Sequence, residues 1–281
     1  MQNLIKEIRN RLGVSQEQLA SALGTSSVSV SRWENGKTKP SVLAEKQLYE
    51  ICKSHRLDLS DYIIDRERSD DEGLILYHAS RSGIVGPIRP ISRERCDFGK
   101  GFYMGTDPLQ PLTLVCNENH PVFYTVAFDT TDLKILNIEI GLDWAMLIAF
   151  YRGYMDSAKE SLLYEKYAHM ADGIDVIVGY IANDRMYQVL TDFFEQRITD
   201  AALMGSLSAL NLGKQFVAVT EKACSRISIR KEKKLSRLEL MILKEKSIVR
   251  RREGISAAGR IVKEHRRDGR YFDEILRGEL L

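Results

Sequence analysis

The run SQEQLASALG at residues 15–24 constrains the fold more than any other part of the chain. Ser15 and Gln18 form a capping-box pattern, in which the serine hydroxyl accepts from the Gln18 N–H and the glutamine side chain reaches back. Gly24 closes the predicted helix, because glycine readily adopts the left-handed conformation that ends helices. Apolar residues before this run also recur at helical spacing, so residues 1–60 are expected to form short amphipathic helices.

The order of these predicted helices and turns resembles the helix-turn-helix domain of the lambda-repressor/Cro family, the XRE type. The resemblance covers about residues 3–54, with the signature SQ-x-x-LA, LG and SRWENG-x-x-P. It implies that a second helix lies in the major groove of DNA, where Arg32 can donate two hydrogen bonds to guanine. The other DNA contacts that the resemblance implies are Gln16, Ser26, Ser27, Ser29 and Lys37.

The charge of this N-terminal part leaves a second interpretation open. Residues 1–66 carry 10 Lys and Arg against 8 Asp and Glu, whereas affinity for DNA grows with the number of phosphates that cationic side chains neutralise. DNA binding is therefore the prediction, and a protein-interaction or dimerisation unit is the alternative. Because one helix-turn-helix reads few base pairs, a homodimer is the expected DNA-binding form.

The pattern of apolar residues changes after residue 73. Residues 61–73, DYIIDRERSDDEG, are polar and charge-rich and are expected to form a linker. Beyond them, short β-type runs alternate irregularly with helical stretches, which favours an α+β domain with a mixed or antiparallel sheet over a doubly wound one. The predicted division is an all-α helix-turn-helix domain at 1–60, the linker, an α+β domain at 74–229 and a basic helical tail at 230–281.

The last two parts carry opposite charge. Residues 67–229 hold 15 Lys and Arg against 22 Asp and Glu, whereas residues 230–281 hold 16 against 9. Most such basic runs are solvated, charge-laced helices. The tail is alternatively expected to hold a nucleic acid near the acidic domain, or to fold back on that domain.

Two segments of the α+β domain carry a second resemblance. The first is YHAS at 77–80, and the second is RCDFGKGFYMGTDP at 95–108. Together, in this order, they resemble the ADP-ribosyltransferase superfamily, in its diphtheria-toxin and poly-ADP-ribose-polymerase-like branch. A bacterial domain family of unknown function shares the run DFGKGFY followed by T-x-P, and the chain resembles a member of it over residues 74–229.

This resemblance implies NAD as a co-substrate and assigns roles to the motif residues. His78 would anchor a ribose, the backbone of Ala79 would hold the nicotinamide amide, and Tyr103 would stack on the nicotinamide ring. Cleavage of the N-glycosidic bond builds oxocarbenium character on the ribose, so the ring must be held and its charge stabilised by fixed groups. Gly99 and Gly101 are expected to let the backbone approach this ligand closely.

The third motif position departs from the pattern of the superfamily. Gln215, in the predicted strand QFVAVT, stands where the superfamily usually has a glutamate. An amide can bind ribose hydroxyls but lacks the charge that stabilises an oxocarbenium ion, and an exposed residue at a strand start is the alternative. Asp184 and Asp97 are further candidate carboxylates. Their alternative settings are a helix start capped by Asn183 and a loop in which Asp97 binds backbone amides.

Other kinds of site have no support in the sequence. The chain has no Gly-x-Ser-x-Gly, Walker or His-Glu-x-x-His motif. Four scattered cysteines without metal-ligand spacing favour a reducing cytoplasm, with neither metal nor disulfide framework. No stretch approaches the roughly 18 apolar residues of a membrane-spanning helix, so a cytoplasmic bacterial protein is expected.

Two functions follow as hypotheses. The first is an NAD-dependent mono-ADP-ribosyltransferase, a toxin or phage-defence effector that modifies a protein or nucleic acid and is regulated or targeted by its DNA-binding module. The alternative is a non-catalytic transcription regulator whose transferase-like domain senses NAD or another nucleotide.

Overall fold

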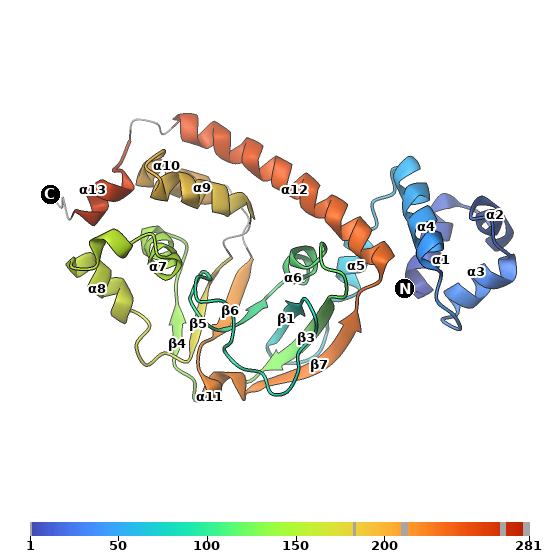
Figure 1. Cartoon of the computed structure of the whole chain (residues 1–281), viewed down its shortest axis with the longest axis horizontal. Coiled ribbons are helices and arrows are strands. Elements are labelled where there is room, and N and C mark those ends of the chain that lie inside the picture. The colour runs from blue at the N-terminus through green and yellow to red at the C-terminus, as the bar shows by residue number, and fades with distance from the viewer. Residues whose placement is uncertain (1, 182–183, 209–212, 265–267, 278–281) are drawn as a thin grey trace.

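The computed structural model describes residues 2–181, 184–208, 213–264 and 268–277. Within these ranges, the side chains of residues 2, 184–187, 208, 250, 251 and 253–264 lie outside the description. The chain forms a helical N-terminal domain and a larger domain built on one sheet (Figure 1). This is the multidomain architecture that the sequence predicted, an all-α part followed by an α+β part.

The N-terminal helices are α1 (Gln2–Leu12), α2 (Gln16–Ala22), α3 (Ser27–Glu34) and α4 (Val42–Ser54). The predicted capping box is present: the Ser15 N–H donates to Gln18 Oε1 over 2.7 Å, and the Gln18 N–H donates to Ser15 Oγ over 3.2 Å. Gly24 has φ +60°, the left-handed conformation expected at the end of the second helix. The local signals were therefore sufficient to predict these elements.

The first part of the predicted linker is a helix instead. Residues 61–65 lie within α5 (Ser60–Asp65), where Ile63 is 2% and Ile64 is 4% exposed. Both side chains join the buried cluster of the N-terminal domain. The linker prediction weighed the charges of this segment, whereas the burial of its two isoleucines decides its conformation.

In the residues that the structure describes, the larger domain is built on a seven-stranded sheet in the order β4-β5-β6-β2-β1-β3-β7. Among these neighbours only β4 and β5 pair in parallel, so of the two predicted kinds, mixed or antiparallel, the sheet is mixed. The strands are β1 (Ile75–Ser80), β2 (Phe102–Gly105), β3 (Val122–Phe128), β4 (Ile135–Asn137), β5 (Val176–Tyr180), β6 (Lys214–Ala218) and β7 (Ile227–Lys234).

Helices cover one face of this sheet. The buried cluster on β5 and β6 includes side chains of α7, α9 and α10, and the cluster on β1 and β3 includes side chains of α6 and α12. Loop residues and α11 cover the other face. These elements are α6 (Leu109–Leu114), α7 (Leu142–Arg152), the 3-10 turn η1 (Asp156–Ala158), α8 (Leu162–His169), α9 (Asp184–Phe194), α10 (Asp200–Ser208), α11 (Glu221–Cys224), α12 (Arg237–Glu264) and α13 (Phe272–Leu276).

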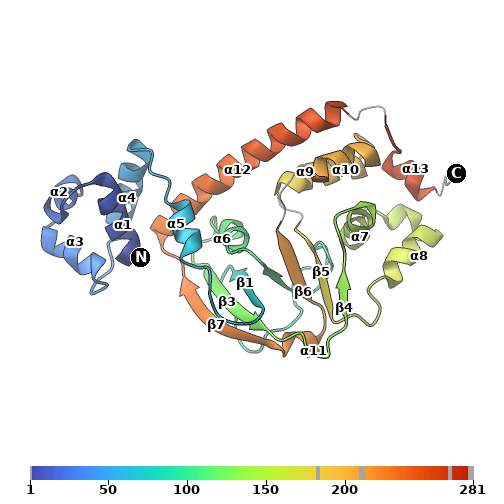
Figure 2. The same ribbon diagram turned by 180° about the vertical axis from the view of Figure 1, so that it is seen from behind.

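The predicted helical tail begins as a strand. Residues 230–234 belong to β7, which pairs along β3 at the edge of the sheet. Strand pairing tolerates its lysines because Glu67, only 4% exposed, binds Lys231 and Lys233 at 2.8 and 2.6 Å. The helix α12 then runs from α4 past α6 to α9 and α10 (Figures 1 and 2).

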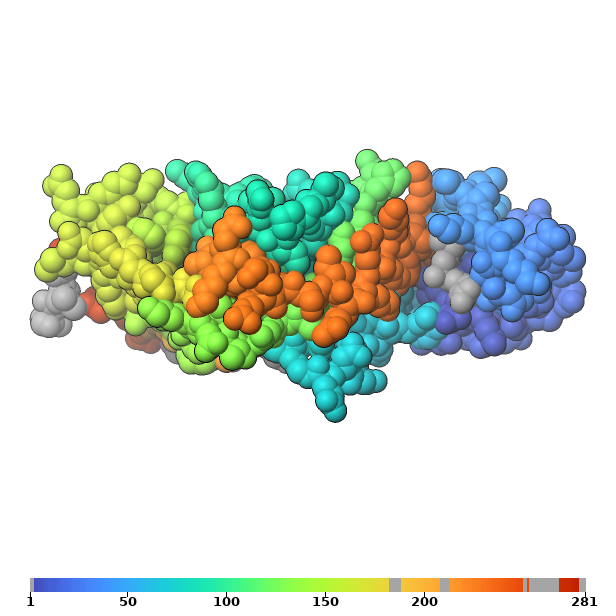
Figure 3. All heavy atoms as spheres, turned by 90° about the horizontal axis from the view of Figure 1, so that it is seen from below, coloured from blue at the N-terminus to red at the C-terminus, as the bar shows by residue number. Residues whose placement is uncertain are grey.

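The start of α12 joins the two domains. Leu238 and Leu243 are fully buried in the same cluster as the core of the N-terminal domain. The Leu238 N–H donates to Glu45 Oε2 of α4 over 2.9 Å, and burial raises the pKa of this carboxyl. Lys246 binds Asp61 at 3.2 Å. The tail is therefore packed at its start rather than solvated, and the N-terminal domain lies at one end of the molecule (Figure 3).

In the described part of the chain, no helix is long and apolar enough to cross a membrane.

Candidate functional site

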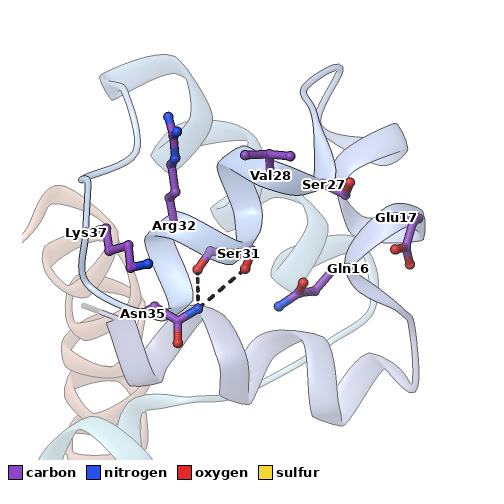
Figure 4. A pocket seen from close by; sticks show the side chains of 8 residues that line it. All are labelled: Gln16, Glu17, Ser27, Val28, Ser31, Arg32, Asn35 and Lys37. Carbon is purple, nitrogen blue, oxygen red and sulfur yellow. Dashed lines mark hydrogen bonds between the residues drawn. The ribbon is translucent and has the colours of Figure 1, made fainter.

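The first candidate site is a hollow of about 380 Å³ between α2 and α3. Figure 4 shows its lining side chains, with Arg32 and Lys37 at one end and Gln16 on the opposite wall. Four of the predicted DNA contacts line it: Gln16, Ser27, Arg32 and Lys37. The lining residues that the sequence analysis did not name are Glu17, Val28, Ser31 and Asn35.

Two predicted DNA contacts have a structural role that accounts for them. Ser26 is the residue before α3, and its hydroxyl accepts from the Ser29 N–H over 3.2 Å. The two hydroxyls also lie 2.9 Å apart, within hydrogen-bond distance. Ser26 therefore caps α3, and Ser29 supplies the N–H that it binds. Val28, 58% exposed on the same helix, offers an apolar surface of the kind that contacts the thymine methyl group.

A buried carboxylate anchors this face from behind. Glu34 accepts from Arg9 Nε over 2.7 Å and from Gln16 Nε2 over 2.7 Å. Burial alone would raise the pKa of Glu34, but these two hydrogen bonds outweigh it and hold the pKa below its ordinary value of 4.5. Gln16 is thus fixed from inside the domain, and no local pattern indicates this contact because Gln16 and Glu34 lie 18 residues apart.

Glu34→Gln tests this anchor. Removing the charge-assisted bonds is expected to lower the free energy of unfolding at pH 7 by about 1–3 kcal/mol. Because the folded-state pKa of Glu34 is lowered, its contribution is present above the ordinary value and lost as pH falls through the folded one. Urea titrations of both proteins should therefore converge below pH 4.5. The control is Glu17→Gln, which changes an exposed carboxylate in the first turn of α2, next to Gln16. An equal loss of unfolding free energy in that variant would refute the specific role of Glu34.

The second candidate site lies on the three adjacent strands β1, β2 and β6. His78 is on β1, Tyr103 is on β2 and Gln215 is on β6. The His78 Nδ1 atom is 2.7 Å from the Tyr103 carbonyl oxygen, and the imidazole stacks on the Phe102 ring with centroids 4.2 Å apart. Burial lowers the pKa of His78. A neutral ring with its hydrogen on Nδ1 leaves Nε2 as a hydrogen-bond acceptor.

Tyr103 is locked against the glycine-containing loop that precedes its strand. Its hydroxyl donates to the Gly99 carbonyl over 2.8 Å and accepts from the Phe98 N–H over 3.0 Å. Burial raises the pKa of this phenol above its ordinary value, so the hydroxyl stays protonated. The ring is therefore a rigid surface whose orientation is set before any ligand arrives.

Gln215 is buried in a polar cluster. The alternative, an exposed residue at a strand start, is therefore wrong. Gln215 is 6% exposed, and its Nε2 donates to Asp97 Oδ2 over 3.3 Å and to the Tyr180 carbonyl over 3.2 Å. Asp97 in turn forms an ion pair with Arg152, and each of these two side chains is 14% exposed. Asp97 is thus tied to side chains from two other elements, α7 and β6.

The pairing register places the motif side chains on two faces. Gln215 lies opposite Gly105 and Tyr103 lies opposite Val217, so Tyr103 and Gln215 share the helix-covered face. His78 shares the other face with Phe102, the neighbour of Tyr103. The printed register of β1 and β2 is the pair Tyr77 and Gly105, and the His78 imidazole contacts the Tyr103 backbone carbonyl near that pair.

Gly99 and Gly101 were predicted to let the backbone approach a ligand, but in the structure they are needed for packing against the chain's own side chains. Gly99 has φ +69°, and a Cβ there would lie 2.8 Å from the Tyr151 ring. At Gly101 a Cβ would lie 2.4 Å from Val217 Cγ1. The space beside both glycines is occupied by the chain's own side chains, so close packing within the protein requires them.

The remaining site predictions have simpler outcomes. Ala79 pairs with Phe123 of β3 and is half-buried. Asp184 is the first residue of α9, and its side chain, like the whole of Asn183, lies outside the described residues. Arg152 was missed because its contact with Asp97 spans 55 residues. In the described part of the chain, no cluster of His, Cys, Asp and Glu could hold a metal ion.

Two family models match the chain. A model described as a protein of unknown function (DUF3990) matches residues 74–229, which are the predicted α+β domain. A helix-turn-helix model matches residues 5–44, which confirms the predicted module and supports DNA binding. No curated protein and no solved structure matches the chain.

Proposed function

We propose that this chain, which belongs to the DUF3990 family of proteins of unknown function, is an NAD-dependent ADP-ribosyltransferase joined to a DNA-binding module. Its acceptor would be a protein or nucleic acid, as for a toxin or phage-defence effector. The DNA-binding module would regulate or target the activity.

One observation carries the proposal for the larger domain. The three strands that bear the motif residues are neighbours in the sheet, in the order β6-β2-β1. In addition, the His78 Nδ1 atom lies 2.7 Å from the Tyr103 carbonyl oxygen, which ties the first two motifs together. Because His78 lies on one face and Tyr103 and Gln215 lie on the other, the proposed dinucleotide would have to contact both faces next to the β1–β2 pair.

Each motif residue then has a chemical task. The Nε2 atom of His78 accepts a hydrogen bond from a ribose hydroxyl, because the ring is neutral. The Tyr103 ring packs on the nicotinamide, and the backbone of Ala79 holds its amide. The C1′–N bond breaks and its electron pair leaves with nicotinamide, so positive charge develops on the ribose. A nucleophilic group of the acceptor then attacks C1′ and releases its proton to water.

A second function is favoured by a separate observation. Gln215 is a neutral amide, and the DNA-binding domain is packed directly on α12 through Glu45 and Leu238. This arrangement suits a regulator whose transferase-like domain binds NAD without consuming it and transmits the bound state to the DNA-binding module.

Labelled NAD distinguishes the two functions. The full chain is incubated with NAD labelled in its adenylate part, with and without cell lysate, and free nicotinamide and labelled macromolecules are measured. Nicotinamide release with label in protein or nucleic acid is the result expected for a transferase. NAD binding without release or label indicates the sensor, and absence of both binding and release overturns the NAD site itself.

Arg32→Ala tests DNA reading by the helix-turn-helix. A bidentate contact to guanine contributes about 1–3 kcal/mol, so affinity for promoter DNA that contains the operator should fall roughly 5- to 150-fold. The measurement is an electrophoretic mobility shift at several salt concentrations. Arg11→Ala is the matched control, because Arg11 binds Glu7 and the Asp58 carbonyl oxygen, away from the hollow. If Arg32→Ala and Arg11→Ala bind the DNA with equal affinity, Arg32 does not read bases, which argues for the protein-interaction alternative.

A further inference from the structure

The ion pair between Asp97 and Arg152 has an unusual setting. Asp97 lies in the loop before β2 and Arg152 is the last residue of α7. Their side chains are each 14% exposed, and removing two charges from water costs several kcal/mol per ion unless other contacts compensate. A hydrophobic pair would fill the same space without this desolvation cost. Packing alone therefore does not explain why charged residues stand at these two positions.

Gln215 connects this pair to the proposed ribose site. Its Nε2 atom carries two hydrogens, and Asp97 Oδ2 and the Tyr180 carbonyl oxygen accept them at 3.3 and 3.2 Å. The orientation of the amide is therefore fixed, and Oε1 is the side-chain atom that remains to accept from a ligand hydroxyl. The indole of Trp144 donates to the same Tyr180 carbonyl over 3.1 Å. This second hydrogen bond holds in place the carbonyl that Gln215 binds.

Tyr103 belongs to the same unit. It shares a face with Gln215, and its hydroxyl binds Gly99, two residues after Asp97. The loop that carries Asp97 is thus held at one end by Arg152 and at the other by the aromatic ring proposed to pack on nicotinamide. The carboxylate, the amide and the ring form one rigid group on the helix-covered face.

We propose that Asp97 supplies the negative charge that Gln215 lacks, and that the missing glutamate function is divided between two residues. Gln215 accepts from a ribose hydroxyl through Oε1, and the Asp97 carboxylate beside it stabilises the cation at C1′. Arg152 is a positioning residue that fixes Asp97. This inference rests on the proposed function and adds a specific source of charge to it.

The chemistry balances without another reagent. The C1′–N bond breaks heterolytically. Its electron pair stays on the ring nitrogen and cancels the positive charge there, so nicotinamide leaves as a neutral molecule. The positive charge moves to C1′ and the ring oxygen of the ribose, where a fixed anion is favourable. The acceptor's lone pair forms the new bond to C1′, and its proton passes to water. Asp97 keeps its charge throughout.

An exchange of the two side chains tests the inference. Asp97→Asn removes the charge and keeps the shape, whereas the double variant D97N/Q215E restores one carboxylate and one amide in swapped positions. Nicotinamide release from NAD, NAD affinity by calorimetry and the thermal midpoint are measured for the full chain. Asp129→Asn is the control, since Asp129 forms an exposed ion pair with Arg226 at 3.4 Å.

The expected pattern separates charge from packing. Asp97→Asn should release nicotinamide about 10²- to 10³-fold more slowly, with NAD affinity within about threefold of the wild type. The swapped double variant should return to within about tenfold of the wild-type rate. Arg152→Lys should retain more activity than Arg152→Gln, because a lysine still offers Asp97 a positive charge.

Other outcomes overturn the inference in distinguishable ways. An active wild type with an equally active Asp97→Asn variant refutes the role of Asp97 and leaves the proposed function standing. Loss of activity in the single and swapped variants alike, with lower thermal midpoints, shows that the cluster only supports the fold. The wild type is assayed before any variant is made. If it neither binds nor cleaves NAD, both the proposed function and this inference are refuted.

Discussion

Trp144→Ala is expected to lower the free energy of unfolding of the sheet domain by about 3–5 kcal/mol, the range for removing a large buried aromatic residue. Trp144 is fully buried in the cluster beneath β5 and β6. Its indole packs beside Gly179, where an added Cβ would lie 3.6 Å from Trp144 Cδ1. Urea titration with circular dichroism at 222 nm measures the loss. The variant also removes the indole N–H that holds the Tyr180 carbonyl in place beside Gln215, so NAD turnover should fall in the protein that remains folded.

Trp144→Phe is the matched control for packing. It keeps most of the ring volume and removes the hydrogen bond from Nε1 to the Tyr180 carbonyl. We expect about 0.5–1.5 kcal/mol of destabilisation, the net contribution of one hydrogen bond, because the carbonyl still accepts from Gln215. A Trp144→Ala variant as stable as the wild type would contradict the position of this residue at the centre of the core.

His78→Ala is the second substitution with a large expected effect. It removes the proposed ribose acceptor and leaves a ligand hydroxyl without a partner, a loss of about 1–3 kcal/mol, or roughly 5- to 150-fold in NAD affinity. It also removes the imidazole that stacks on Phe102. Calorimetric titration with NAD measures the effect. His78→Gln, which can accept a hydrogen bond through its amide oxygen, should recover part of the affinity.

The pH dependence of NAD binding gives a second readout of His78. Burial lowers its pKa below the ordinary value of 6.5, so the neutral acceptor persists at and somewhat below that pH. NAD affinity should therefore stay constant from pH 8 down to 6.5 and fall only in more acidic solution. A decline centred at 6.5 would show that His78 titrates as an exposed histidine does, and would contradict its buried role.

The elements set by local sequence could be predicted from the sequence. The capping box of Ser15 and Gln18 and the turn at Gly24 depend on residues within one or two helical turns of each other. The irregular succession of strands and helices was also sufficient to indicate a mixed sheet. In each case the interactions that decide the structure lie close together in the chain, so that their signal appears in the sequence.

The elements set by distant partners could not be predicted. Ile63 and Ile64 are buried because α5 packs into the cluster that also contains the start of α12, about 180 residues later. Lys231 and Lys233 lie in a strand because β3 offers an edge and Glu67 offers a buried carboxylate. The sequence shows the charges of these segments, but their partners depend on the tertiary fold.

The same distinction applies to the candidate site. The motifs placed His78, Tyr103 and Gln215 on strands, and the structure makes those strands neighbours. The ion pair of Asp97 with Arg152 and the bond of Trp144 to Tyr180 were missed, because they join residues 55 and 36 positions apart. Gly99 and Gly101 were noticed for the right property, the absence of a side chain. The neighbours that require it, Tyr151 and Val217, were visible only in the fold.

The most direct test of the proposed NAD site is an experimental structure of the full chain with NAD bound. We predict that the nicotinamide packs on the Tyr103 ring, with a ribose hydroxyl within hydrogen-bond distance of His78 Nε2. The C1′ atom should lie next to Gln215 Oε1 and the Asp97 carboxylate. A dinucleotide bound elsewhere on the chain, or a chain that takes up no NAD at millimolar concentration, would contradict the account.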